Sequence, residues 1–200
     1  MFGRPYFKKS EHFLPPAEQV LDSAYYNADN HGTTGPIFSV YSNEFAASHQ
    51  FWHSTLSNMD IETNRDHFGG SNVGAWTTLT SVDPTTRTRC YSASGYYHPA
   101  MSRPNLSVLT QAMVEEIMLD QVDSQWVAKG VRFTHSGEEH YASASKEIII
   151  CAGSVQSPQL LELSGIGNPA ILQAAGIKVK MPNPNVGENL QEHMSRWKPC

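Results

Sequence analysis

The sequence has few charged residues, few cysteines and no long hydrophobic run. Asp, Glu, Lys and Arg make up 16% of its 200 residues, against about 25% in typical globular domains. The three cysteines, Cys90, Cys151 and Cys200, are an odd number at wide spacing, which is typical of neither a disulfide framework nor a CxxC zinc site. The longest aliphatic run covers residues 148–150, far short of the roughly 20 apolar residues that span a membrane. A disulfide scaffold, a zinc ribbon and a membrane protein are therefore not expected.

Positive charge is also scarce. Fourteen Lys and Arg against nineteen Asp and Glu give a net charge of −5, and the charge is spread evenly on both sides of Pro104. A nucleic-acid-binding protein is not expected, because it would need a basic patch or arm.

The eight Phe, eight Tyr and four Trp are too much apolar surface for a disordered tail. No apolar stretch of signal-peptide length opens the chain, but its location in the cell stays unknown, and secretion stays open.

The first half of the chain predicts short elements joined by loops. Residues 1–30 are typical of a helix end followed by a loop rich in Asn, Asp and His. A β-prone run follows at 37–41, and apolar positions spaced along 44–61 predict a helix. Residues 76–91 are rich in Thr and aromatic side chains, which favours extended structure.

The second half predicts a small antiparallel meander that leads into a central sheet. A turn is expected at 135–138, because His-Ser-Gly-Glu lies between two β-prone runs. The run at 147–152 is continuously apolar and β-branched, which is typical of a buried strand. Strands are expected at 106–110, 114–119, 126–134, 139–145 and 147–152.

The most informative stretch is a strand, a small turn and a helix in residues 148–167. The missing side chain of Gly153 lets a ligand or another backbone approach closely. Ser157 is expected to cap the helix, with Pro158 at its first position and Gly165 after its end. Nucleotide-binding α/β folds use this arrangement, although an ordinary strand-to-helix connection has the same outline. Residues 165–170 satisfy GxGxxA, but a helix precedes them, so we do not interpret them as a dinucleotide loop.

Residues 153–167 resemble the second signature of the glucose-methanol-choline (GMC) oxidoreductases. That pattern has two small residues, then Ser-Pro, two apolar residues and Ser-Gly-apolar-Gly. Residues 103–114, RPNLSVLTQAMV, and residues 184–193, PNVGENLQEH, are similar to the segments that flank the signature in the family. Residues 5–11 and 76–89 are similar to its entry into the substrate domain and to its Asp-Pro-Thr region.

The resemblance implies a mixed α/β and α+β fold that binds FAD. Residues 1–104 would be part of an antiparallel-sheet substrate-binding domain, and 105–200 part of a Rossmann-like FAD-binding domain with its β-meander, strand and signature helix. Val114 would meet the adenine end of FAD through its backbone, and Ala152 and Gly153 would border the same nucleotide. Such enzymes oxidise alcohols by passing hydride to the flavin, which O₂ or another acceptor then reoxidises.

Two parts of the family pattern have no counterpart in these 200 residues. One is the GxGxxG loop that cradles the pyrophosphate, and the other is the segment with the catalytic His. The resemblance therefore implies a central fragment of a GMC enzyme, with no catalytic residue in this chain, that binds FAD poorly when alone. Two alternatives stay open. The chain could be a truncated, non-catalytic product or interaction module, or an unrelated α/β binding domain whose turn mimics the signature.

Other candidate sites are weaker. His49 and His53 have the spacing of a metal-binding pair, but structural histidines are the favoured interpretation and no metal is expected. Residues 143–146 read SxxK without the accompanying motifs of penicillin-binding enzymes. Asn105 opens a glycosylation sequon, but it lies where a strand is expected to begin. The last candidates are three aromatic residues, Phe51, Trp52 and Trp76. Packing in the core is the default interpretation for such side chains, and lining a substrate cavity is the alternative.

Overall fold

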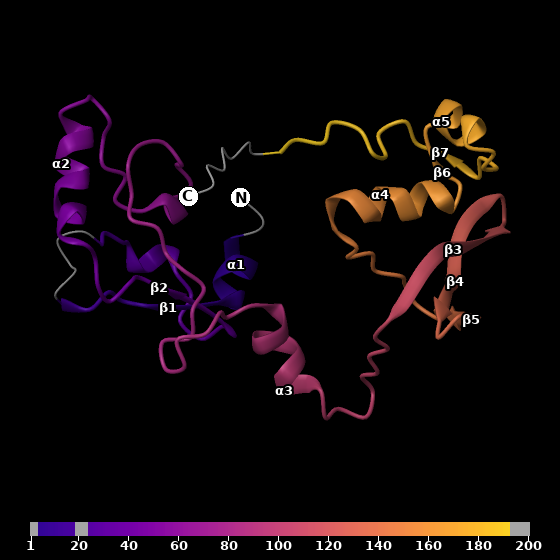
Figure 1. Ribbon diagram of the computed structural model, residues 1–200, viewed down its shortest axis with the longest axis horizontal. Coiled ribbons are helices and arrows are strands. Elements are labelled where there is room, and N and C mark those ends of the chain that lie inside the picture. The colour runs from indigo at the N-terminus through magenta and orange to yellow at the C-terminus, as the bar shows by residue number, and fades with distance from the viewer. Residues whose placement is uncertain (1–3, 19–23, 193–200) are drawn as a thin grey trace. The chain divides into compact units, whose positions relative to one another are not determined.

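The computed structural model describes residues 4–18 and 24–192 of the chain (Figure 1). Contacts along the chain divide it into two compact units, Met1–Ser107 and Val108–Cys200. Each unit mixes helices with strands, so the predicted mixed fold class is confirmed. The assignment of 1–104 to a substrate-binding domain and of 105–200 to an FAD-binding domain stays a prediction. No helix in the described parts of the chain is long and apolar enough to cross a membrane.

The first unit is built on two short parallel strands. Strand β1 (Glu11–Leu14) pairs with β2 (Ile37–Val40) with Glu11 opposite Ile37. The other elements are short helices: α1 (Arg4–Ser10), η2 (Ala28–Asn30), η3 (Ala47–Phe51), α2 (Trp52–Ser57), η4 (His67–Gly69), the π-helix η5 (Ala93–Tyr97) and α3 (His98–Ala100). The predicted strand at 37–41 is thus confirmed, whereas β1 was not expected from the sequence.

A small aromatic core holds this unit together. Phe13, Ala24 and Tyr41 are buried against one another, and three partly buried residues pack around them: Ala17, Phe45 and Leu79. The chain turns back onto β1 at Gly32, whose carbonyl accepts from the N–H of Phe13 at 2.7 Å. A Cβ at Gly32 would lie 1.7 Å from the carbonyl oxygen of Lys8. Only glycine fits this close approach of two backbones.

Two predictions in the first unit are only partly confirmed. Within the range 44–61 the regular structure is limited to η3 and α2. The expected apolar stripe is not buried, because Phe51 and Trp52 are 59% and 58% exposed. Residues 76–91 are extended as expected, but they form isolated bridges, Val40 with Thr80 and Val82 with Arg89, instead of a strand. An Asp83 carboxylate that accepts from the N–H groups of Thr85 and Thr86 makes the turn between them.

The second unit contains the predicted meander. Strands β3 (Ala112–Val122), β4 (Gln125–His135) and β5 (Glu138–Ser143) form an antiparallel sheet in that order (Figure 1). Both connections have two residues with positive φ, at 123–124 and at 136–137. Two such residues define the type I′ turn that suits the twist of a hairpin. The expected turn at 135–138 is therefore confirmed.

The elements after the meander are a helix and a small parallel pair. Helix α4 (Gly153–Leu163) is followed by β6 (Ile166–Gly167), α5 (Pro169–Ala174) and β7 (Met181–Pro182), which pairs with β6. The side chain of Asn168 caps α5 by accepting from the N–H of Ala170 at 3.0 Å. The expected cap at Asn168, with Pro169 at the first position of the helix, is therefore confirmed, and helix α4 precedes Gly165 as expected.

Three expectations for the second unit are wrong. Residues 106–110 are exposed and form no strand, and residues 147–152 pair with no strand among the described residues. Ile149 in the latter segment is 74% exposed, because a buried strand needs neighbours on its edges and faces, and β-propensity supplies none. Helix α4 begins at Gly153, so that Pro158 lies inside it and Ser157 does not cap it. The Oγ of Ser157 instead accepts from the N–H of Ala152 at 3.1 Å.

Candidate functional site

A buried serine joins the signature helix to the meander. Ser164, directly after α4, is 1% exposed. Its Oγ accepts from the N–H of Ile117 in β3 at 2.8 Å and donates to the carbonyl of Leu160 at 2.6 Å. Because β3 is an edge strand, alternate N–H groups point away from β4 and need another partner. The signature serine therefore satisfies a strand donor and a helix acceptor at once.

Val114, the residue expected at the adenine, lies beside a β-bulge. It pairs with Phe133, but the next pair is Glu116 with Arg132, so Glu115 is an extra residue in β3. Bulges interrupt the ladder and redirect the strand, often next to functional sites. The Val114 side chain is 37% exposed. Its backbone thus lies directly before an irregularity in the pairing of β3 with β4.

The side chain of Glu115 is held from β4. Thr134 Oγ1 donates to Glu115 Oε1 at 2.6 Å, and Arg132 Nη1 donates to Glu115 Oε2 at 2.5 Å. Arg132 Nη1 also lies 3.1 Å from Glu139 Oε2, and Arg132 Nε lies 3.5 Å from Glu116 Oε2. A hydrogen bond from the Tyr141 hydroxyl, with Arg132 as a further cause, lowers the pKa of Glu139.

Ala152 and Gly153 leave the start of α4 open. Both residues are exposed, and Gly153 has a φ of +84° with no atom within 4 Å of the position its Cβ would take. The first N–H groups of a helix have no partner inside it, so backbone donors are available here. This fits the close backbone approach expected for FAD. Helix α4 packs against β3, but no hydrogen bond among the described residues joins Gly153 to Val114.

The histidine pair forms a structural contact. His49 Nε2 and His53 Nε2 lie 3.4 Å and 3.1 Å from the hydroxyl of Thr77, a residue that is 8% exposed. Thr63 Oγ1 lies 3.5 Å from the other ring nitrogen of His53. Within residues 4–18 and 24–192, no group of three or more His, Cys, Asp or Glu could hold a metal ion. These contacts support the structural interpretation of the two histidines.

The glycosylation sequon lies in a different setting from the one expected. The strand predicted to begin there is not formed, and Asn105 is an exposed turn residue. The turn is closed by a hydrogen bond from the N–H of Leu106 to the carbonyl of Arg103 at 3.1 Å. Core packing is wrong as the default for Phe51 and Trp52, which are 59% and 58% exposed. Trp76 is half-buried and stacks on His67 with 5.2 Å between the ring centroids.

Sequence reasoning missed a buried hydrogen bond between a histidine and a carboxylate in the first unit. His31 is 4% exposed, and its Nδ1 donates to Glu11 Oε1 at 2.9 Å. Its Nε2 lies 3.7 Å from Asp66 Oδ2, beyond hydrogen-bonding distance. The ring stacks on Phe13 with 4.0 Å between centroids. No short motif connects these positions, because the three polar residues are far apart in the sequence.

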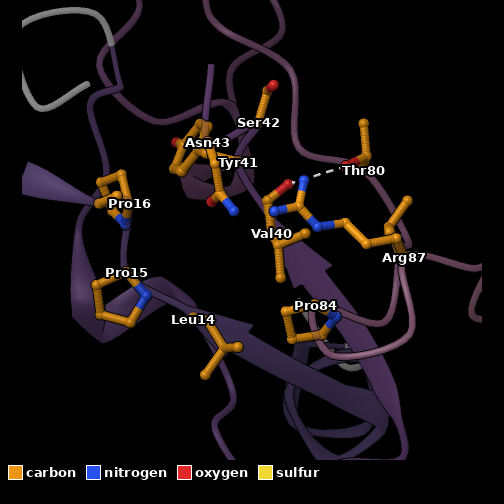
Figure 2. Close-up of a pocket in the computed structure, with 12 residues that line it drawn as sticks. Leu14, Pro15, Pro16, Val40, Tyr41, Ser42, Asn43, Thr80, Pro84 and Arg87 are labelled. Atoms are coloured by element: carbon orange, nitrogen blue, oxygen red, sulfur yellow. Dashed lines mark hydrogen bonds between the residues drawn. The ribbon is translucent and has the colours of Figure 1, made fainter. Parts of the chain in front are cut away.

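A hollow of about 370 Å³ lies beside the core of the first unit. Figure 2 shows Leu14, Pro15 and Pro16 on one side of it, and Pro84 and Arg87 on the other. Tyr41, which also lines it, donates its hydroxyl hydrogen to the carbonyl of Tyr25 at 2.7 Å. Burial, with the Asp66 carboxylate as a second cause, raises the pKa of Tyr41 to about 12. Tyr41 is therefore a neutral structural donor in this wall.

Comparison with solved structures places the fold among FAD-dependent oxidoreductases. An FAD-dependent oxidoreductase from Chaetomium thermophilum has a TM-score of 0.82 at 29% identity, with 90% of this chain and 31% of that chain covered. A fungal aryl-alcohol oxidase has a TM-score of 0.82 at 26% identity, with 90% and 30% covered. The family model for GMC oxidoreductases matches residues 42–195. The chain belongs to the GMC oxidoreductase family, and the cofactor of this family is FAD.

Curated relatives agree with this assignment. Dehydrogenase mpl7 of Monascus purpureus is 44% identical over 195 residues, which cover 94% of this chain and 30% of the relative. The chain thus spans about 30% of the length of the relatives that it matches. The resemblance drawn from residues 103–114, 153–167 and 184–193 is confirmed.

Proposed function

We propose that this chain forms the central part of an enzyme that oxidises the CH–OH group of a small alcohol. When bound, FAD supplies the hydride acceptor for this reaction. The observation that carries the proposal is the signature segment 153–167, which folds as α4 and fastens to the meander through Ser164 and Ile117. The family match over 42–195 supports the class of reaction.

The chain's own part in this reaction is to hold the adenine half of the cofactor. Val114 would present its backbone to the adenine from the bulge in β3. Ala152 and Gly153 would border the same nucleotide from the start of α4, where no atom lies within 4 Å of the position that a Cβ on Gly153 would take. No side chain among these three residues can take up a proton, so the catalytic base must come from elsewhere in the enzyme.

We infer that the 200 residues alone bind FAD poorly and do not oxidise alcohols. They contain no GxGxxG loop that follows a strand and opens a helix, and such a loop is the usual anchor of the pyrophosphate. They also span only about 30% of the matching relatives. The substrate and the electron acceptor, O₂ or another oxidant, depend on parts of an active site that these residues do not supply.

Flavin content tests the proposal. The protein expressed from its full coding sequence should purify with bound FAD, identified by its absorbance and by chromatography after heat release. The 200-residue chain, purified in parallel, should be colourless and should not retain FAD on a desalting column. A colourless full-length protein that stays colourless after incubation with excess FAD would show that the chain belongs to a non-catalytic family member. A yellow 200-residue chain would overturn the inference about the missing anchor.

A further inference from the structure

The bulge beside Val114 is surrounded by an unusual set of charges. Glu115, Glu116 and Glu139 converge on the single guanidinium of Arg132, and Lys180 Nζ adds one ion pair to Glu116 at 3.0 Å. The carboxylates outnumber the two cations, so they would repel one another without Arg132. The guanidinium suits this position because its planar set of donors can serve several oxygens at once.

The geometry of these contacts differs from that of an ordinary surface ion pair. Arg132 lies opposite Glu116 in the ladder, yet its shortest contact, 2.5 Å, is to the bulged residue Glu115. Thr134, from the same face of β4, holds the second oxygen of that carboxylate at 2.6 Å. Both oxygens of the extra residue are therefore fixed from the neighbouring strand. A bulged residue has lost its ladder partner, so these side-chain bonds replace the constraint that the ladder would give.

We propose that Arg132, together with Thr134, is a positioning residue that fixes the bulge at Glu115 and so orients the backbone of Val114 toward the adenine of FAD. This inference rests on the proposed role of Val114. Arg132 itself does not touch the cofactor. It sets the shape of β3 at Glu115, the residue of that strand that has no partner in β4.

The binding of two ligands, AMP and FMN, distinguishes this positioning role from a general effect on stability. AMP carries the adenine end of the cofactor, and FMN carries the flavin end without the adenine. In the protein from the full coding sequence, freed of flavin, Arg132→Met should weaken binding of FAD and of AMP by about two- to fivefold, an ion-pair-sized effect, and leave FMN binding unchanged. Thr134→Val, which keeps the shape of the side chain, should act in the same direction. Lys129→Met is the matched control, because Lys129 is an exposed cation on the same strand without an ion pair among the described residues.

The outcomes are distinct. Weaker FAD and AMP binding in both variants, with the control unchanged, supports the positioning role. Equal losses for AMP and FMN would show a general loss of structure and overturn it, as would wild-type affinities in Arg132→Met. If the wild-type protein binds neither FAD nor AMP, the proposed function itself fails, and the positioning role fails with it. Thr134→Val, which removes no charge, keeps the test decisive where Arg132→Met does not fold.

Discussion

The N–H of Ile117 and the Oγ of Ser164 are joined by a buried hydrogen bond of 2.8 Å. It connects the strand that carries Val114 to the helix that begins at Gly153. The two backbone segments proposed to border the adenine therefore belong to elements that are fastened to each other. The bond lies at the end of α4 and beyond the bulge in β3, so it can fix the two elements without facing the cofactor.

Ser164→Ala should destabilise the second unit. The substitution leaves the buried N–H of Ile117 without an acceptor, which costs about 1–3 kcal/mol. The measurement is the free energy of unfolding in urea, followed by circular dichroism. Ser154→Ala, an exposed position on the same helix, is the matched control and should change the free energy by less than about 0.5 kcal/mol. Equal, small effects of both substitutions would contradict the structural role of Ser164.

His31→Leu should destabilise the first unit. The Glu11 side chain is 11% exposed, and the substitution removes the Nδ1–H group that donates to its Oε1 at 2.9 Å. Leaving a buried acceptor without its donor costs about 1–3 kcal/mol. Thermal unfolding measures the loss, with His98→Ala at an exposed position as the control. The double variant with Glu11→Gln should recover part of the stability, and no recovery would argue against the pair.

The raised pKa of Tyr41 predicts that the folded chain loses stability at alkaline pH. Its pKa is raised to about 12 in the folded chain, chiefly by burial, against about 10 when unfolded. The folded state therefore keeps the proton longer, and its stability falls as the pH rises from about 10 to about 12, by roughly 2 kcal/mol. Unfolding free energies across this range measure the effect. The unfolding free energy of Tyr41→Phe should fall less steeply with pH in this range. Equal slopes for the variant and the unmodified protein would contradict the raised pKa of Tyr41.

Gly153→Ala should weaken FAD binding in the protein from the full coding sequence. Gly153 has a φ of +84°, where a Cβ is strained, and it lies in the proposed nucleotide site. Gly176→Ala is a close match, since Gly176 has a φ of +72° and equally open surroundings but lies after α5. Both variants should lose about 1 kcal/mol of stability. Only Gly153→Ala should bind FAD more weakly, and equal FAD affinities would remove Gly153 from the site.

The parts of the fold that depend on neighbours in sequence could be predicted, and those that depend on distant partners could not. The hairpin at 135–138 and the cap at Asn168 follow from local turn and capping chemistry. The prediction of a strand at 147–152 failed because β-propensity alone supplies no pairing partner, and this segment pairs with no strand among the described residues. The prediction for the start of α4 failed because local preferences place Pro158 at the first position of a helix, whereas α4 begins at Gly153 and contains Pro158.

The candidate site shows the same division. Val114, Ala152 and Gly153 could be proposed from the family resemblance. Ser164 is part of the signature pattern, but the pattern does not show which residue its side chain contacts. Its contact with Ile117 spans 47 positions of the chain, and a single sequence carries no sign of it. The bulge at Glu115 was equally hidden, because the sequence does not show which residue of the strand lacks a partner in β4.

Anaerobic reduction of the bound flavin tests the central claim most directly. The protein from the full coding sequence, with FAD bound, is mixed without oxygen with an aryl alcohol, a sugar or choline, and the flavin absorbance is followed. The account predicts that at least one alcohol bleaches the flavin and is converted to its aldehyde or ketone, and that deuterium on the carbinol carbon slows the reaction. A bound flavin that is reduced by a chemical reductant but by no alcohol of any class would contradict it.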